Sequence, residues 1–175
     1  VIVTPGSPRL ASSPGAVTLA AIPRGWMHMQ LEYLMTYHAD LKPPVEVGAG
    51  PAGTRRIFDV TGGAFEGPRL RGTVLPSGGD WLLTTADGTG RLDVRATLAT
   101  DDGAFIYVQY HGILVMSPAG AAKLARGEAT GYGDQYFMTA PRMETGDARY
   151  SWVNSIACVA EGRLAPGRVE YRVYQ

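Results

Sequence analysis

The sequence predicts an all-β chain that closes into an antiparallel β-barrel of about eight strands, calycin-like, with one short helix. Short segments of alternating apolar and polar residues recur along the chain, and 23 glycines and 12 prolines are spread between them in turn positions. Tight turns favour a meander of sequential strands, and closing such a meander removes its exposed edges. Polar and aromatic residues in mid-strand positions need a wet or ligand-filled place, which favours a barrel with a lined cavity.

Residues 1–29 are expected to form an irregular extension, because they are poor in charge and rich in Pro, Ser and Ala. A processed leader or a mistaken start site is the alternative. Residues 30–175 are expected to form a single barrel domain. The alternation predicts strands over nine segments: Leu31–Leu41, Arg55–Thr61, Arg69–Leu75, Trp81–Thr85, Arg91–Thr100, Ala104–Val115, Tyr136–Thr145, Tyr150–Ala160 and Arg168–Tyr174.

Turn residues separate these segments. Asp87-Gly88 and Pro166-Gly167 have the composition of tight turns, and residues 48–53 (GAGPAG) are predicted to form a loop. That loop lacks the following helix and the GK[ST] ending that a phosphate cradle needs. Ser117 is a suitable N-cap, Pro118 suits the first helical position and Gly127 suits the end, so a short helix is expected between them.

Composition excludes several classes of function. Lys plus Arg and Asp plus Glu both number 16, so the formal net charge is zero, which argues against nucleic acid or an anionic membrane as the partner. No apolar run approaches the roughly 20 residues of a membrane span. The single cysteine, Cys158, cannot form an internal disulfide, and a cytoplasmic location is expected. No histidine pair or CxxC has metal-ligand spacing, so neither a metal nor a cofactor is expected.

Arg142 and Glu144 are the first catalytic candidates, because residues two apart share one face of a strand. In the functional interpretation, Arg142 anchors a ligand oxyanion and Glu144 moves protons. The alternative is a surface ion pair that contributes little to stability. Asp80 is interpreted as a carboxylate that caps a turn after Gly78-Gly79.

The ligand-binding candidates are aromatic and polar residues placed by strand alternation. Tyr150, Trp152 and Asn154 are expected to share one strand face, bulky and amphipathic enough for a pocket wall or for the barrel core. A second row, with Tyr107 and His111 on one face of the segment Ala104–Val115, can line a cavity or face water. The full set is Trp81, Tyr107, His111, Tyr150, Trp152 and Asn154.

The segments TGGAFEGPRLRG, GGDW, TDDGAFIYV and PRMETGDARYSWVN, in this order, resemble the DUF3237 family, also labelled UPF0311. The resemblance covers about Leu31 to Tyr174. It implies a calycin-like or allene-oxide-cyclase-like β-barrel, an oligomer of two or more copies, and a small, largely apolar or aromatic ligand. The family pattern has an aromatic residue where this chain has Ala96, so the pocket is expected to be enlarged or a family function impaired.

Asp93 and Arg95 are catalytic candidates through this resemblance. Strand alternation alone favours placing their polar row in solvent, opposite the apolar row of Leu92 and Val94. The resemblance favours the inward orientation. Arg95 would then hold an enolate-like oxygen and Asp93 would move the proton.

Three functions stay open on the sequence. The first is a cofactor-free cyclase, isomerase or dehydratase that acts on an aromatic or polyketide-like molecule, in which a buried carboxylate with a raised pKa performs acid/base chemistry. The second is a lipocalin-like carrier that binds an apolar molecule without changing it. The third is an interaction module for which the barrel is only a scaffold.

Overall fold

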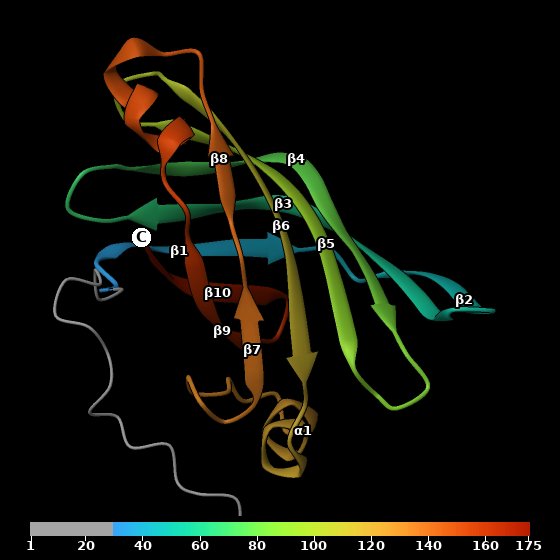
Figure 1. Ribbon diagram of the computed structural model, residues 1–175. Helices are drawn as coiled ribbons and strands as arrows, with labels where there is room; N and C mark the ends of the chain where they lie inside the picture. Colours follow the sequence, from blue (N-terminus) through green and yellow to red (C-terminus); the bar gives the residue numbers. More distant parts are fainter. Residues whose placement is uncertain (1–29) are drawn as a thin grey trace, which may run out of the picture. The chain divides into compact units, whose positions relative to one another are not determined.

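The computed structural model describes residues 30–175, and the expectation for residues 1–29 lies outside them. Eight strands of the described part form a closed antiparallel barrel, two further strands extend it, and one short α-helix follows β6 (Figure 1). The elements are β1 (Tyr33–Leu41), β2 (Val45–Gly50), β3 (Gly53–Glu66), β4 (Arg71–Thr84), β5 (Gly90–Thr100), β6 (Phe105–Val115), α1 (Pro118–Ala125), β7 (Tyr136–Thr139), β8 (Arg142–Glu144), the 3₁₀ helix η2 (Ala148–Ser155), β9 (Val159–Ala165) and β10 (Arg168–Tyr174).

The barrel closes because β1 pairs on both of its edges. Its neighbours around the ring are β10 and β3, and the remaining order is β9, β7, β6, β5 and β4. The extra strand β2 pairs with β3, and β8 pairs with β6. The predicted fold class, a closed barrel with one short helix, is therefore confirmed.

The helix α1 has the cap that the sequence predicts. The Ser117 side chain accepts a hydrogen bond from the Gly120 amide at 3.0 Å, and Pro118 occupies the first turn. Gly127 follows the helix with a φ of +74°, which suits the left-handed position beyond a helix end. The helix lies at the end of the barrel where β6 ends and β7 begins (Figure 1).

Five predicted segments differ from the structure. The expected loop 48–53 contributes to β2, and the two segments predicted around Gly78-Gly79 form one long strand, β4. Pro141 separates the segment Tyr136–Thr145 into β7 and β8, because proline has no N–H for the ladder. Most of Tyr150–Ala160 is 3₁₀ helix, and only its last two residues belong to β9.

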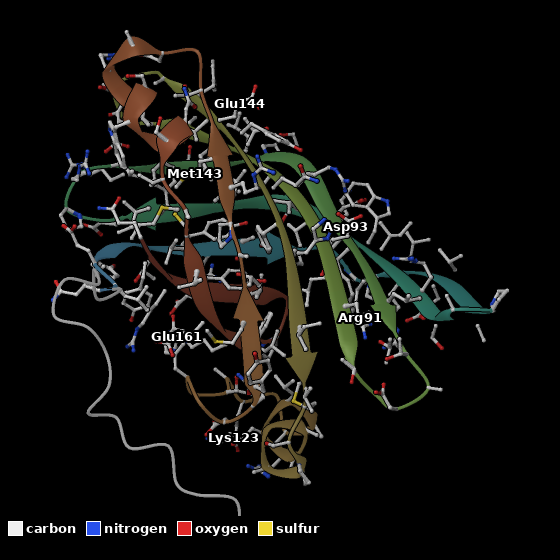
Figure 2. All side chains as sticks on the ribbon, in the orientation of Figure 1. Arg91, Asp93, Lys123, Met143, Glu144 and Glu161 are labelled. Atoms are coloured by element: carbon white, nitrogen blue, oxygen red, sulfur yellow. The ribbon has the colours of Figure 1, made fainter. Side chains whose placement is uncertain are left out.

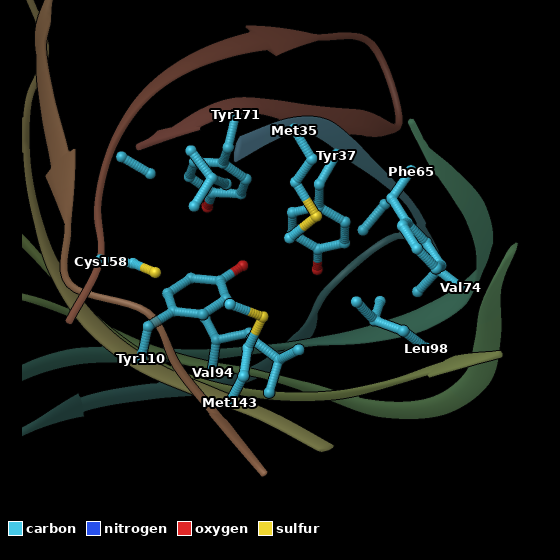
Figure 3. Close-up of a cluster of buried hydrophobic side chains, with 14 of the residues drawn as sticks. Met35, Tyr37, Phe65, Val74, Val94, Leu98, Tyr110, Met143, Cys158 and Tyr171 are labelled. Atoms are coloured by element: carbon cyan, nitrogen blue, oxygen red, sulfur yellow. The ribbon is translucent and has the colours of Figure 1, made fainter. Parts of the chain in front are cut away.

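Side chains fill one half of the barrel. Met35, Phe65, Val74 and Leu98 are buried there between strands that are distant in sequence (Figure 3). Strand alternation explains this core, since every second residue of β5 from Leu92 to Leu98 is buried. The other half, toward α1, is hollow.

Candidate functional site

A cavity of about 310 Å³ occupies the hollow half of the barrel. Its lining includes Leu124 of α1 at one end and a layer of tyrosines at the other. The walls between them are mostly aliphatic, contributed by Leu41, Leu82, Leu92, Val94, Leu114 and Leu164. Such a cavity suits a small apolar molecule.

Three tyrosines form the floor of this cavity. The rings of Tyr37 and Tyr171 stack with their centroids 5.6 Å apart, and Tyr110 meets Tyr171 edge to face at 5.4 Å. Their hydroxyl oxygens lie inside the barrel (Figure 3). The buried Tyr37 hydroxyl has no hydrogen-bond partner of good geometry among the described residues, although the Tyr110 hydroxyl is near it. This hydroxyl is almost fully enclosed, so it belongs to the packed side of the tyrosine layer.

Burial raises the pKa of the three phenols, which are protonated at neutral pH in any case. It raises the pKa of Tyr37 to about 12, while the nearby Tyr110 hydroxyl opposes that rise. The pKa values of Tyr110 and Tyr171 are also raised well above the ordinary range, mainly by burial. All three groups are therefore hydrogen-bond donors at neutral pH.

Asp80 is the one acidic residue among the described residues that line the cavity. Burial raises the pKa of its carboxyl from 3.8 to about 6; the hydrogen bond from the Asp93 amide opposes the rise and the Asp93 carboxylate adds to it. That amide donates to Asp80 Oδ1 at 3.1 Å. Asp80 keeps an intermediate exposure because part of its surface faces the cavity. A carboxyl group with a pKa near neutrality can both accept and return a proton.

The position of Asp80 follows from an irregularity in β4. The pairing of β4 with β5 shifts register between Val74 and Gly78, and after the shift Asp80 lies opposite Val94, a residue of the inner face. Gly78 allows this register shift because glycine adopts its φ of +98° without strain. It also lies very close to β5, since a Cβ there would be 2.1 Å from the Arg95 carbonyl oxygen.

Arg56 is the one cation among the described residues that line the cavity. Its Nε donates to both carboxylate oxygens of Glu46 in β2, each at 3.0 Å. The side chain is 43% exposed, so it stands where the cavity meets solvent.

The predicted inward orientation of Asp93 and Arg95 is wrong. Both lie on the outer face of β5, because the inner positions of this strand are taken by its buried apolar row. There Arg95 donates to Asp93 at 3.0 Å and lies over the Trp81 ring, and His111 reaches Asp93 at 3.7 Å. The structure thus brings four predicted site residues together, but outside the cavity.

Arg142, Glu144 and Tyr107 also point outward. They belong to β8 and β6, which pair side by side with Tyr107 opposite Glu144. The inward residue of β8 is Met143, and Glu144 lies toward the end of the barrel remote from α1 (Figure 2). Within the described residues neither Arg142 nor Glu144 forms an ion pair. Their catalytic roles stay predictions, and no cavity-lining position supports them.

Tyr150, Trp152 and Asn154 lie on η2 rather than on a strand face. Asn154 accepts a hydrogen bond from the Thr145 amide and donates to the Thr145 carbonyl, at 2.8 and 3.0 Å. The Arg69 guanidinium stacks 3.6 Å above the Trp152 ring. These contacts hold η2 in place, and none of the three residues lines the cavity.

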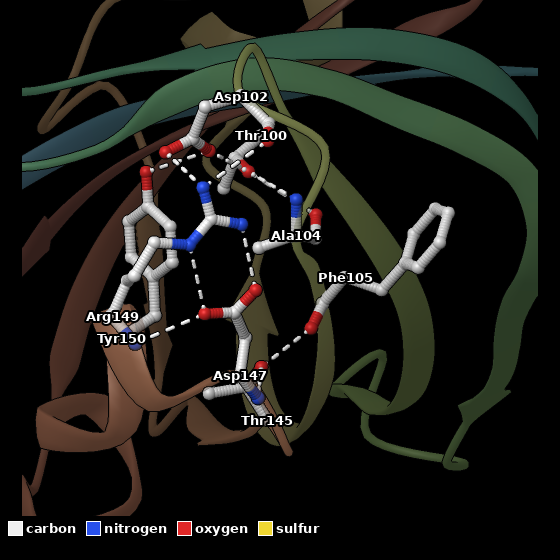
Figure 4. A network of polar contacts seen from close by, with 8 residues as sticks. All are labelled: Thr100, Asp102, Ala104, Phe105, Thr145, Asp147, Arg149 and Tyr150. Atoms are coloured by element: carbon white, nitrogen blue, oxygen red, sulfur yellow. Dashed lines mark hydrogen bonds and ion pairs between the residues drawn. The ribbon is translucent and has the colours of Figure 1, made fainter.

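A polar network further explains the helical turn at this segment (Figure 4). Asp147 caps η2 by accepting from the Arg149 amide at 3.0 Å. The Arg149 guanidinium bridges Asp147 and Asp102, and the Tyr150 hydroxyl donates to Asp102 at 3.0 Å. Every charged group of the network is paired, so it serves to anchor η2 to the turn between β5 and β6.

Comparison with known proteins gives the family. The model of the family described as "Protein of unknown function (DUF3237)" matches residues 29–175. The chain belongs to the DUF3237 family. A UPF0311 protein of Rhodopseudomonas palustris is 32% identical over 147 residues, which cover 84% of this chain and 96% of that protein.

Solved structures related to this DUF3237 chain share its barrel. A crystal structure described as a beta-barrel like protein, from Acinetobacter baumannii AYE, is 35% identical with a TM-score of 0.74, and the match covers 86% of this chain and 98% of that one. A crystal structure described as an enzyme from Penicillium herquei has a TM-score of 0.61 at 22% identity, covering 86% and 99%. The latter likeness concerns the fold alone.

Sequence reasoning missed the residues that line the cavity of this DUF3237 barrel. Asp80 was expected to cap a turn, although it shares strand alternation with Leu82, which faces inward. Ala96 is buried on the inner face but does not line the cavity, so the expectation of an enlarged pocket there is not met. The floor could have been predicted from one carboxylate, Asp80, and three tyrosines, Tyr37, Tyr110 and Tyr171, which all occupy inner positions of strands.

Three further observations concern residues 30–175 as a whole and the single cysteine. These residues contain no group of three or more His, Cys, Asp or Glu side chains that could hold a metal ion. In the same range no helix is long and apolar enough to cross a bilayer. Burial raises the pKa of Cys158 to about 11, which makes its thiol a poor nucleophile at neutral pH. The expected homo-oligomer stays a prediction.

Proposed function

We propose that this protein is a cofactor-independent acid/base enzyme of the cyclase, isomerase or dehydratase type, acting on an aromatic or polyketide-like small molecule inside the barrel. The observation that carries the proposal is the Asp80 carboxyl, which faces an apolar cavity beside three protonated phenols and has a pKa raised to about 6. Titratable groups perturbed in this way mark candidate catalytic sites.

The floor supplies the two partners that enolisation needs. Asp80, once ionised, takes a proton from a carbon next to a carbonyl group, and the electron pair of that C–H bond moves toward the carbonyl oxygen. A tyrosine hydroxyl of the floor donates a hydrogen bond to this oxygen. Donors fixed in a dry site stabilise developing charge more strongly than water does.

Protonated Asp80 then returns its proton to complete the reaction. Delivery to a different carbon gives an isomer, and delivery to a leaving hydroxyl group gives water and a dehydrated product. Ring closure results where the carbanion attacks a second carbonyl of the same molecule and the new alkoxide takes the proton. The apolar walls favour aromatic substrates in all three cases.

Proton exchange of a model ketone tests the proposal. The probe is 2-tetralone in D₂O near neutral pH, and the loss of its α-proton signals is followed by ¹H NMR. The unmodified protein should accelerate the exchange, and Asp80→Asn should lower that acceleration at least about 100-fold, as for a lost general base. Binding of 2-tetralone should survive, because Asn fills the same space.

Glu144→Gln is the comparison variant. Since Glu144 lies on the outer face, its exchange rate should stay within about twofold of the unmodified protein. A large loss in Glu144→Gln with full activity in Asp80→Asn would instead support the assignment made from the sequence. Binding of the ketone without accelerated exchange would favour the lipocalin-like carrier, for which the mostly aliphatic walls are equally suitable.

A further inference from the structure

The opening of the cavity carries a charge that the acid/base proposal does not use. Arg56 extends from β3 beside Phe58, and its Nε is engaged by Glu46. Its two Nη groups make no hydrogen bond within the described residues. A guanidinium group has five N–H donors, so this one keeps several for a ligand.

The pairing of β3 with β4 shows how far apart Arg56 and Asp80 lie along these strands. Phe58 lies opposite Asp80, and Arg56 lies opposite Leu82, two residues further along the same pair of strands. Two residues of strand span about 7 Å, so the backbone positions of Arg56 and Asp80 are offset along the strand pair by about the length of a naphthalene ring system. Aliphatic side chains line the space between them.

Electrostatics fixes the direction in which an anionic ligand can bind. Above a pH of about 6 the Asp80 carboxyl is ionised, and it would repel a negative group placed at the floor. Arg56 attracts that group at the opening, where it also stays accessible to water. An aromatic acid would therefore bind with its carboxylate at Arg56 and its ring system toward the tyrosines.

We propose that the ligand is an aromatic carboxylic acid whose carboxylate pairs with Arg56 while its reacting carbon lies at Asp80; this rests on the proposed function, since it assumes that the cavity takes the substrate. Arginine suits the role because its planar fork matches a carboxylate with two hydrogen bonds.

Glu46 competes with this ligand for the same guanidinium. The ion pair is exposed, at 43% for Arg56 and 56% for Glu46, and exposed pairs contribute little. A ligand carboxylate can therefore approach Arg56 against weak opposition. Removing the Glu46 charge should tighten anion binding, whereas removing the Arg56 charge should weaken it. A structural role of the pair would not produce these opposite effects.

Calorimetric titration of two probes tests the proposal. The probes are 2-naphthoate and its neutral analogue 2-naphthamide, at pH 7.5. The unmodified protein should bind the carboxylate about tenfold more tightly than the amide, as expected for a charge-assisted pair. Arg56→Gln should abolish this preference, and Glu46→Gln should increase the carboxylate affinity about threefold.

Arg91→Gln is the matched control, since it removes the same charge from the exposed outer face of β5 (Figure 2). It should keep the full preference, which separates a local contact from a change in net charge. Thermal melts of all variants check folding. Equal binding of both probes by the unmodified protein, binding of neither, or a preference that survives Arg56→Gln would overturn the proposal.

Failure of this ligand proposal can be told apart from failure of the proposed enzyme function. A carboxylate preference that depends on Arg56, in a protein that does not accelerate proton exchange of 2-tetralone, would support the ligand class and remove the enzyme. Exchange that depends on Asp80 without any carboxylate preference would keep the enzyme and overturn the ligand class.

Discussion

Asp80 shows how much of a residue's character comes from its surroundings. The local sequence Gly-Gly-Asp-Trp is typical of a turn, and an aspartate there is expected to cap it. In the barrel the same residue lies at an inner position, opposite Phe58 and Val94 on the neighbouring strands. Alternation with Leu82 indicates this orientation only if Gly78, Gly79 and Asp80 belong to one strand, and that continuity depends on a register shift earlier in β4.

Asp80→Asn should stabilise the protein above neutral pH. Since the folded chain holds the Asp80 proton more tightly than the unfolded chain, stability is lost as the pH rises from about 4 to about 6, and it stays lost above that range. Asparagine cannot ionise, so the variant should gain on the order of 2 kcal/mol in the free energy of unfolding at pH 8. Its advantage should shrink toward zero at pH 4.

Urea denaturation of both proteins at pH 4 and pH 8 measures this difference. An unchanged difference at the two pH values, or a variant that is less stable at pH 8, would show that Asp80 is not a desolvated carboxyl group.

At the scale of elements, the alternation of apolar and polar residues predicts the regular strands well. It placed β5 and β6 nearly to the residue, and the cap of α1 was confirmed. It was wrong for η2, because side-chain contacts hold that segment: Asn154 with Thr145, Asp147 with the Arg149 amide, and Arg149 with Asp102. Such side-chain contacts leave no periodic signal, and the one between Arg149 and Asp102 joins residues 47 positions apart.

The irregularity of β4 depends on Gly78. Gly78→Ala should lower the free energy of unfolding by about 3 kcal/mol, because alanine is strained at this positive φ and its Cβ would overlap the Arg95 carbonyl. Gly88→Ala is the control: its φ of +83° is also positive, but a Cβ there meets nothing within 4 Å. It should lose only about 1 kcal/mol.

Denaturant unfolding of both variants gives the comparison. Equal losses would mean that backbone strain alone matters and that the close approach of β4 to β5 does not. A Gly78→Ala variant as stable as the unmodified protein would contradict the described register shift.

At the scale of the whole described unit, residues 31–175, the barrel divides into a packed half and a hollow half with the tyrosine layer between them. Closure was predictable, because short strands with tight turns have few other ways to protect their edges. The residues that face the cavity were not predictable in the same way. The charged candidates came from the outer faces of β5 and β8, whereas the cavity is lined by one carboxyl and three phenols, with one guanidinium at its opening.

The central claim is that a carboxyl group poised near neutral pH faces a ligand inside the barrel. Titration of the Asp80 side-chain carbon by ¹³C NMR tests it most directly, with Asp80→Asn to identify the signal. The free protein should show a midpoint at about pH 6, and 2-naphthoate should move that midpoint upward by filling the cavity and excluding water. A midpoint near 3.8 that does not change when the ligand is added would contradict the claim.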